Sequence, residues 1–296
     1  MQSGSMPYHQ PSTPRDYQQP FNWWGYRSSP ERPLSITELI AHKTLDEQLA
    51  AFLWIAMEQR ASLIVAATPH EAGKTTMLTA LLDFLPERTE LIYLRGWYER
   101  FEFLQDERDP ASTYLLSNEI SSHLPIYMWG RGVRKLFEAA GEGYGFGATV
   151  HAGGADEVLR MLANYPLEVP DALLTEIDLV LTLAYRPGVR NPQRRVMKLE
   201  VIDDAGGRPS PKTLASRDVI GTELHSSPGT LINALVRSFG LERDYATNEL
   251  ARRVSALRRL VRSETFDQVD VRRAIRRFQT EPAPSRTGTS GESTGR

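Results

Sequence analysis

The chain has 296 residues, of which 41% are hydrophobic, so it is long enough for one large domain or for a medium domain with an appendage. Its 35 Lys and Arg against 37 Asp and Glu give a net charge of −2, which argues against a globally basic nucleic-acid-binding protein. The absence of cysteine excludes disulfide bonds, thiolate metal sites and thiol nucleophiles, and no apolar run approaches the roughly 20 residues that cross a bilayer.

Residues 1–33 form a distinct first segment, rich in Pro, Gln, Ser and Tyr. This composition predicts a disordered leader, and its start lacks the basic-then-apolar pattern of a signal peptide, so we expect a soluble, cytoplasmic protein. Trp23 and Trp24 lie in an apolar cluster of this leader. Two adjacent tryptophans favour a second interpretation, in which the cluster docks on the chain's own core or on a partner, and both interpretations stay open.

Residues 34–222 have the pattern of an α/β domain. Residues 45–60 show the apolar spacing of three and four that is typical of an amphipathic helix, and residues 62–67 predict a short buried strand. Apolar runs predict further strands at 91–94, 113–117, 147–151, 178–184 and 195–202, with helices at 75–84, 132–140, 155–163 and 170–176. Strands that alternate with helices imply a mostly parallel sheet covered on both faces.

Residues 223–280 predict a small C-terminal helical subdomain, and residues 281–296, rich in Pro, Ser, Thr and Gly, predict a flexible tail. The stretch from Arg243 to Arg277 contains ten arginines, most of them in adjacent pairs, against five acids. Such pairs could form a patch for nucleic acid or anionic lipid. We favour instead the solvated face of an amphipathic helix or an interface to an acidic neighbour.

The sequence between the first strand and its helix predicts a phosphate-binding loop, the Walker A motif, centred on Gly73-Lys74-Thr75. The flanking strand and helix disfavour the alternative, a chance Gly-Lys-Thr in a surface turn. Backbone amides of such a loop and the positive end of the next helix converge on phosphate oxygens. Lys74 would reach the β- and γ-phosphates, and the Thr75 hydroxyl would help to hold Mg²⁺. The candidate nucleotide-binding residues are Thr68, Pro69, His70, Glu71, Ala72, Gly73, Lys74, Thr75 and Thr76.

One position of this loop departs from the motif, because Thr68 stands where the first glycine is usual. A β-branched residue does not enter positive φ cheaply. We therefore expect either a slightly rearranged loop or an ordinary β-region geometry at Thr68.

Four passages around the loop resemble the type II/type IV secretion ATPase family, the hexameric motors of pili and secretion systems, with the closest likeness to archaeal-type and Tad-type members. These passages are the lead-in segment 34–40, the Walker B-like stretch 113–119 that ends in Asn118-Glu119, the histidine-box-like stretch 147–152, and the late hairpin 177–180 with 194–202. The resemblance implies a RecA-like P-loop NTPase core, with a small C-terminal helical appendage.

The resemblance also implies roles for three residues outside the loop. Glu119 matches the Walker B glutamate that orients or deprotonates the attacking water, His151 matches a histidine that senses the γ-phosphate, and Glu99 is the one match to the family's acidic box. We expect the strand that carries Glu119 to lie next to the strand before the phosphate loop. The competing interpretations are a surface acid that starts a helix for Glu119, and a strand-end imidazole bonded to backbone for His151.

Several features depart from the family pattern. Arg95 and Gly96 stand where acids are usual, and Ser121 and Ser122 replace an arginine expected after the Walker B glutamate. Family members also carry a sizeable preceding domain that supplies arginines to the nucleotide, whereas about thirty residues precede the core here. Missing arginines would slow hydrolysis by several powers of ten.

Three functions are compatible with these observations. The first is an ATP-hydrolysing, Mg²⁺-dependent motor subunit in a homo- or hetero-oligomeric ring of up to a hexamer, peripheral at the inner face of the membrane beside a secretion or pilus platform protein, without a nucleic-acid partner. The second is a degenerate nucleotide-binding regulatory or scaffold subunit that partners a complete motor. The third, a P-loop enzyme acting on a small molecule or nucleic acid, is disfavoured by the histidine box and the late hairpin.

Overall fold

The computed structural model describes residues 17–20, 23–24, 32–68, 71–188 and 192–280. One eight-stranded sheet organises these residues. The predicted α/β fold with a mostly parallel sheet is confirmed, since five neighbouring strands are parallel and the remaining strands join antiparallel at one side. In spatial order the strands are β2 (Glu90–Tyr93), β3 (Thr113–Ile120), β4 (Gly145–Val150), β1 (Leu63–Ala66), β5 (Leu179–Arg186), β6 (Gln193–Asp204), β7 (Pro209–Ser216) and β8 (His225–Ser226).

The lateral order of the strands corrects one expectation. β3, which carries Glu119, does not lie next to β1, because β4 is inserted between them. Side chains pack closely over β4 at Gly147, where a Cβ would lie 2.9 Å from the Leu78 side chain and 3.2 Å from the Tyr114 ring. The order of strands along a chain does not fix their order across a sheet, so the sequence could not supply this detail.

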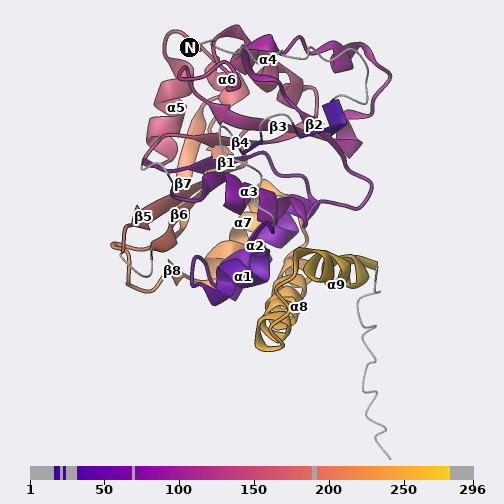
Figure 1. The fold of residues 1–296 in the computed structure, drawn as a ribbon, viewed down its shortest axis with the longest axis vertical. Coiled ribbons are helices and arrows are strands. Elements are labelled where there is room, and N and C mark those ends of the chain that lie inside the picture. The colour runs from indigo at the N-terminus through magenta and orange to yellow at the C-terminus, as the bar shows by residue number, and fades with distance from the viewer. Residues whose placement is uncertain (1–16, 21–22, 25–31, 69–70, 189–191, 281–296) are drawn as a thin grey trace, which may run out of the picture.

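Helices cover both faces of the sheet (Figure 1). Alternate side chains of β1 enter opposite apolar clusters, Leu63 and Val65 on one face and Ile64 and Ala66 on the other. The second face packs against α4 (Arg131–Gly141), α5 (Ala155–Ala163) and α6 (Asp171–Leu174). The first packs against α1 (Ile36–Ala41), α2 (Glu47–Glu58), α3 (Lys74–Leu82), α7 (Pro228–Ser238), α8 (Arg243–Arg262) and α9 (Gln268–Thr280).

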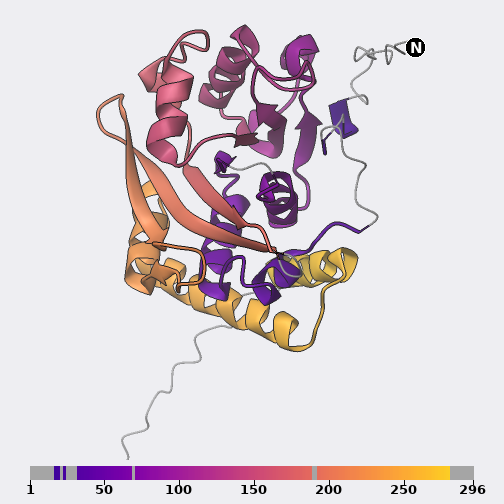
Figure 2. The same cartoon turned by 60° about the vertical axis from the view of Figure 1, so that its left-hand side comes forward.

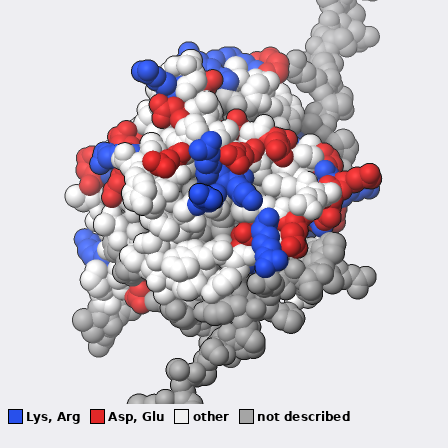
Figure 3. All heavy atoms as spheres, turned by 90° about the horizontal axis from the view of Figure 1, so that it is seen from above, with Lys and Arg blue, Asp and Glu red and all other residues white. Residues whose placement is uncertain are grey.

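The outer surface over α4–α6 carries charges of both signs. Figure 3 shows basic and acidic side chains interspersed on this face, with an uncharged area beside them. On α4, Arg134 and Glu138 form one such exposed pair, 3.0 Å apart. This face therefore presents no large patch of one sign.

Helix α2 is buried on all sides. Every residue from Leu49 to Met57 is buried, because α2 lies beneath the sheet and packs against α3, α7 and α8. Its start is fixed by the Asp46 side chain, which accepts a hydrogen bond of 2.7 Å from the Leu49 amide. Near its end, the Trp54 ring stacks on Phe84 at a centroid distance of 5.0 Å.

The three C-terminal helices exist as predicted and share the apolar cluster of α1–α3. Many of their arginines bind carboxylates of the chain itself. Arg253 pairs with Glu58 and Glu249, and Arg272 with Asp83 at 2.7 Å. These ion pairs fit the interpretation of an interface with an acidic neighbour. The neighbour is the same chain, because the carboxylates come from α2, α8 and the end of α3.

Strands β7 and β8 lie where the sequence predicts no strand. Pro209 and Pro211 suggest a loop, yet both belong to β7 and pair with β6. Strand β8 pairs only with Ala215 and Ser216, so the prolines face the open edge of the sheet, where a missing N–H costs no ladder hydrogen bond. The long β5 and β6 strands cross the molecule toward the N-terminal helices (Figure 2).

Short 3-10 helices follow β2, at Gly96–Tyr98, Glu102–Gln105 and Pro110–Ser112. None of the helices in the described part of the chain combines the length and apolar character needed to cross a membrane.

Two residues of the predicted disordered leader pack on the core instead. Trp23 is buried, donates from Nε1 to the Thr79 hydroxyl of α3 at 2.9 Å, and meets the Tyr93 ring edge-on. Tyr17 is also buried and donates to Glu99 at 3.1 Å. The docking interpretation therefore describes these residues, because aromatic area buried against β2 and α3 outweighs the ordering entropy. Residues 1–16, 21–22 and 25–31 and the predicted tail at 281–296 lie outside the described residues.

Replacing Trp23 tests this anchor. We expect Trp23→Ala to lower the free energy of unfolding by about 2 kcal/mol, because it removes a buried ring and its hydrogen bond. Urea denaturation followed by circular dichroism measures the change. Trp97→Ala is the matched control, since the Trp97 side chain is 51% exposed, and should change stability by less than about 0.5 kcal/mol. Equal effects of the two changes would contradict the anchor.

A buried carboxyl group links the starts of β1 and β5. Asp178 accepts a hydrogen bond of 2.7 Å from the Ser62 amide, and burial raises its pKa from 3.8 to about 6. Between about pH 4 and about pH 6, the folded protein therefore keeps a proton on Asp178 that the unfolded chain releases. The stability from this group is fully present below pH 4 and is lost as pH rises through about 6.

Asp178→Asn keeps an oxygen acceptor for Ser62 and removes the charge. Relative to the unmodified protein, its free energy of unfolding should be similar near pH 4 and higher by about 1–3 kcal/mol at pH 7. Denaturation curves from pH 4 to 8 measure this difference, with Asp218→Asn, at an exposed position, as the control. Parallel pH profiles for Asp178→Asn and the unmodified protein would contradict the assignment.

Candidate nucleotide-binding site

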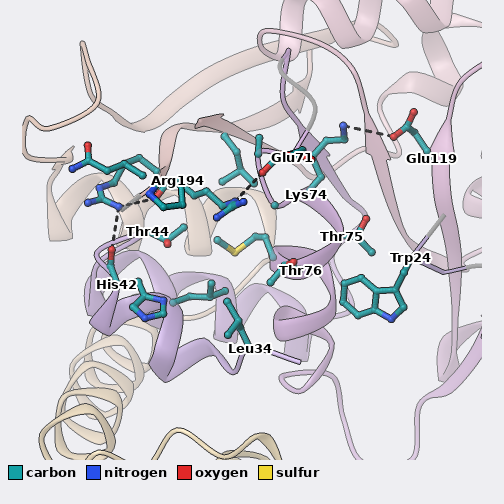
Figure 4. A pocket seen from close by; sticks show the side chains of 18 of the residues that line it. Trp24, Leu34, His42, Thr44, Glu71, Lys74, Thr75, Thr76, Glu119 and Arg194 are labelled. Atoms are coloured by element: carbon teal, nitrogen blue, oxygen red, sulfur yellow. Dashed lines mark hydrogen bonds and ion pairs between the residues drawn. The ribbon is translucent and has the colours of Figure 1, made fainter. Parts of the chain in front are cut away.

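A cavity of about 700 Å³ lies at the carboxyl ends of the parallel strands. Such edges are where open α/β sheets bind ligands. Figure 4 shows side chains from the phosphate loop, from the region of α1 and from β6 around this cavity. Its lining consists of Trp24, Leu34, Leu39, His42, Thr44, Glu71, Ala72, Gly73, Lys74, Thr75, Thr76, Met77, Glu119, Tyr127, His151, Leu183, Pro192, Gln193, Arg194 and Arg195.

The phosphate loop connects β1 to α3 and makes its tight turns near its end. Glu71 has φ +68° and Gly73 has φ +90°, both in the left-handed region. Thr68 is not among the positive-φ positions of the described residues, so it adopts an ordinary backbone geometry and needs no glycine. Of the two expectations for Thr68, the structure shows the second.

The start of α3 lacks a side-chain cap. The N-cap residue is Gly73, which has no side chain to accept from the first-turn amides, whereas Ser35 and Asp46 cap α1 and α2. Uncapped amides and the helix dipole favour an anion at this end. The start of α3 faces the cavity, where such an end suits a phosphate group.

Lys74, Glu119 and His151 meet at one end of the cavity. The Lys74 Nζ lies 3.6 Å from Glu119 Oε2 and 3.2 Å from His151 Nε2. His151 Nε2 lies 3.4 Å from Glu119 Oε1. The three predicted side chains, far apart in sequence, are thus brought together (Figure 4 shows the pair of Lys74 and Glu119).

Burial sets the electrostatics of this cluster. Lys74 and Glu119 are each 8% exposed. Burial lowers the pKa of Lys74 below its usual 10.5, and the charge of Glu119 acts in the opposite direction. A buried ammonium beside one carboxylate is a strong site for a further anion, because little water screens it.

An irregularity in β3 positions Glu119. The register between β3 and β4 shifts between Ser117 and Ile120, and the Asn118 carbonyl accepts from the Thr149 hydroxyl at 2.6 Å. The Glu119 carbonyl accepts from the Met128 amide at 2.8 Å. Glu119 thus lies inside the strand and is nearly buried, which excludes the interpretation as a surface acid that starts a helix.

Glu99 lies away from this cluster and does not line the cavity. Its carboxylate accepts hydrogen bonds from the amides of Arg95 and Phe101 and from the Tyr17 hydroxyl. Burial raises the pKa of Glu99 above its usual value. In this structure the carboxylate fixes the turn after β2, and a catalytic role for Glu99 stays a prediction.

The remaining predicted binding residues divide into three groups. Glu71, Ala72, Gly73, Lys74, Thr75 and Thr76 line the cavity, whereas Thr68 does not. Pro69 and His70 lie outside the described residues.

Among the described residues no group of three His, Asp or Glu side chains could hold a metal ion by itself. A Mg²⁺ ion at this site fits the Thr75 hydroxyl together with phosphate oxygens, a donor set of hard oxygens.

Sequence reasoning missed much of the far wall of the cavity. His42 and Thr44 follow α1, and Arg194 and Arg195 come from β6. The Arg195 guanidinium donates to the His42 carbonyl at 3.0 Å, which ties β6 to this segment. The adjacent arginines in the late hairpin were a signal that could have been followed. No sequence signal marks His42 or Thr44.

No family model matches the chain. Two proteins of Methanocaldococcus jannaschii are similar in sequence. The uncharacterized protein MJ1287 is 23% identical over 255 residues, which span 77% of this chain and 92% of MJ1287. The uncharacterized protein MJ0900 is 26% identical over 276 residues, which span 83% of this chain but only 49% of MJ0900, so the chain covers about half of that relative.

Two solved structures are similar in fold. The ATPase DotB of Legionella pneumophila matches 80% of this chain and 60% of its own, with 15% identity and a TM-score of 0.39. The VirB11 ATPase of the Brucella suis type IV secretion system, in complex with sulphate, matches 78% of this chain and 68% of its own, with 19% identity and a TM-score of 0.34. Both scores lie below 0.5, so the fold is described from this chain's own sheet order and phosphate loop.

Proposed function

We propose that the chain binds ATP with Mg²⁺ in this cavity and hydrolyses it as a motor subunit of a type II or type IV secretion or pilus-assembly system. One observation carries the nucleotide chemistry: Lys74, Glu119 and His151 meet within 3.6 Å at the end of an uncapped phosphate loop. A buried cation, a carboxylate and an imidazole around an anion-binding loop are the groups that phosphoryl transfer to water requires.

Each of these residues has a defined role in the proposal. When ATP binds, the Lys74 ammonium leaves Glu119 and contacts the terminal phosphates. Glu119 then orients the attacking water. Water adds to the γ-phosphorus, the bond to the β–γ bridging oxygen breaks, ADP leaves, and the water proton passes to Glu119 and then to solvent. His151 donates to a γ-phosphate oxygen. Mg²⁺, held in part by the Thr75 hydroxyl, supplies positive charge to the β- and γ-phosphates.

The biological setting is carried by the resemblance of the four sequence passages to secretion ATPases with a RecA-like core. On that basis we propose a cytoplasmic ring, hexameric as in the family, that acts beside an inner-membrane platform protein. The archaeal-type or Tad-type assignment belongs to the same proposal. Residues 34–222 would form the ATPase core and residues 223–280 a C-terminal subdomain packed on it.

A second function is favoured by one specific observation. The carboxylate that matches the acidic box, Glu99, is engaged by two backbone amides and Tyr17 outside the cavity. Among the described residues that line the cavity, only Glu71 and Glu119 carry a carboxylate. A nucleotide-binding scaffold subunit with slow turnover, partnered with a complete motor, is therefore the alternative.

Two substitutions separate binding from chemistry. We expect Lys74→Ala to weaken ATP binding at least about 100-fold, because it removes the buried cation. Glu119→Gln should keep ATP binding and lower kcat about 10²–10⁴-fold, because the amide cannot accept the water proton. Calorimetry with Mg²⁺ and ATP measures binding, and phosphate release measures turnover.

Glu138→Gln is the matched control, since this carboxylate lies on α4 in an exposed pair with Arg134. It should change neither quantity. Saturable ATP binding with turnover at background in the unmodified protein would support the scaffold function instead. If ATP does not bind at all, both functions are refuted. A measurement of molecular mass with and without ATP tests the proposed ring.

A further inference from the structure

Arg194 reaches from β6 over the phosphate loop. Its Nε donates to the Glu71 carbonyl at 2.8 Å, and its side chain lines the same cavity as Lys74. Figure 4 shows the Arg194 side chain directed across the loop toward Glu71. Arg194 thus contacts the phosphate loop at Glu71, which lies 123 positions away in sequence.

The fit between Arg194 and the loop is close. A Cβ at Gly73 would lie 3.2 Å from Arg194 Cδ and 3.7 Å from its Nε. The stem of Arg194 therefore rests against the glycine, which also has φ +90° and disfavours any larger residue. Glycine at position 73 thus permits both the left-handed turn of the loop and the close approach of the Arg194 side chain.

An aromatic ring supports the guanidinium from its own hairpin. Arg194 lies directly opposite Tyr185 in the β5–β6 ladder, and its Cζ is 5.1 Å from the Tyr185 ring centroid. Cross-strand neighbours on one face restrict each other's rotamers, and the ring attracts the cation. The hairpin thus fixes the direction in which Arg194 points.

The charge of Arg194 is not neutralised by the described part of the chain. No described carboxylate lies within ion-pair distance of it, and its terminal Nη groups donate to no described acceptor. By contrast, Arg253 and Arg272 pair with buried carboxylates. A planar donor fork at the wall of an anion-binding cavity is suited to a phosphate in two-point contact.

We propose that Arg194 is a phosphate-binding residue that acts within its own chain: its guanidinium contacts the terminal phosphates of the bound nucleotide and stabilises the charge that develops there during hydrolysis. This inference rests on the proposed nucleotide binding. It gives the site an arginine that needs no preceding domain and no neighbouring subunit.

The test compares two nucleotides on Arg194→Gln. Calorimetry with Mg²⁺ should show AMP-PNP, which keeps three phosphates and is not hydrolysed, binding about tenfold to a hundredfold more weakly, whereas ADP affinity changes less than about threefold. Arg194→Lys should recover part of the loss, because it keeps the charge but not the fork. Arg186→Gln is the matched control, since Arg186 lies on the same hairpin, bonds Gln193 and does not line the cavity.

Each other outcome overturns the inference. Equal loss for both nucleotides would mean that Arg194 only supports the loop, and tighter binding would mean that it blocks the cavity. Unchanged affinities for both nucleotides would remove any role in binding. If the unmodified protein binds neither nucleotide, the proposed function fails and this inference with it, whereas normal binding by the unmodified protein confines a failure to Arg194.

Discussion

The ion pair between the buried Lys74 ammonium and Glu119 is the interaction on which the site depends. An ammonium removed from water costs several kcal/mol unless an opposite charge compensates it, and Glu119 supplies that charge at 3.6 Å. The same carboxylate is the group proposed to orient water. In the proposed mechanism, a phosphate that binds Lys74 would release Glu119 at the moment when the substrate is present. The ion pair would thus couple nucleotide binding to the availability of Glu119.

This contact exists only because three strand ends are held in register. β4 and β3 bring His151 and Glu119 to the edge where β1 leads through the phosphate loop to Lys74, the first residue of α3. Helix α3, which carries Lys74, is held along its length by distant segments. Trp23 binds Thr79, whose hydroxyl donates to the Thr75 carbonyl at 2.7 Å, and Arg272 binds Asp83 just beyond its end. The leader and the C-terminal helix thus meet on the helix that holds the phosphate loop.

The sequence predicted the parts of this site that depend on local pattern. A buried strand followed by Gly73-Lys74-Thr75 and a helix is a local pattern, and the ends of the strands near Glu119 and His151 are predicted to within about three residues. Lateral features were not predictable, because strand insertion, the packing of Tyr17 against Glu99 and the arrival of Arg194 depend on residues far apart in the chain. β7 was missed for another reason: two prolines argue against a strand unless its edge position is known.

The placement of positive charge shows how composition and structure differ. The stretch from Arg243 to Arg277 is rich in arginine, yet several of its guanidinium groups bind Glu58, Asp83 and Glu249 and hold α8 and α9 on α2 and α3. Charge satisfied in this way is unavailable to an anionic ligand, since a ligand would have to displace a nearly buried carboxylate. Arg194 differs from these arginines, because it comes from the β5–β6 hairpin, lines the cavity beside Lys74, and makes a contact with the Glu71 carbonyl that a phosphate could replace.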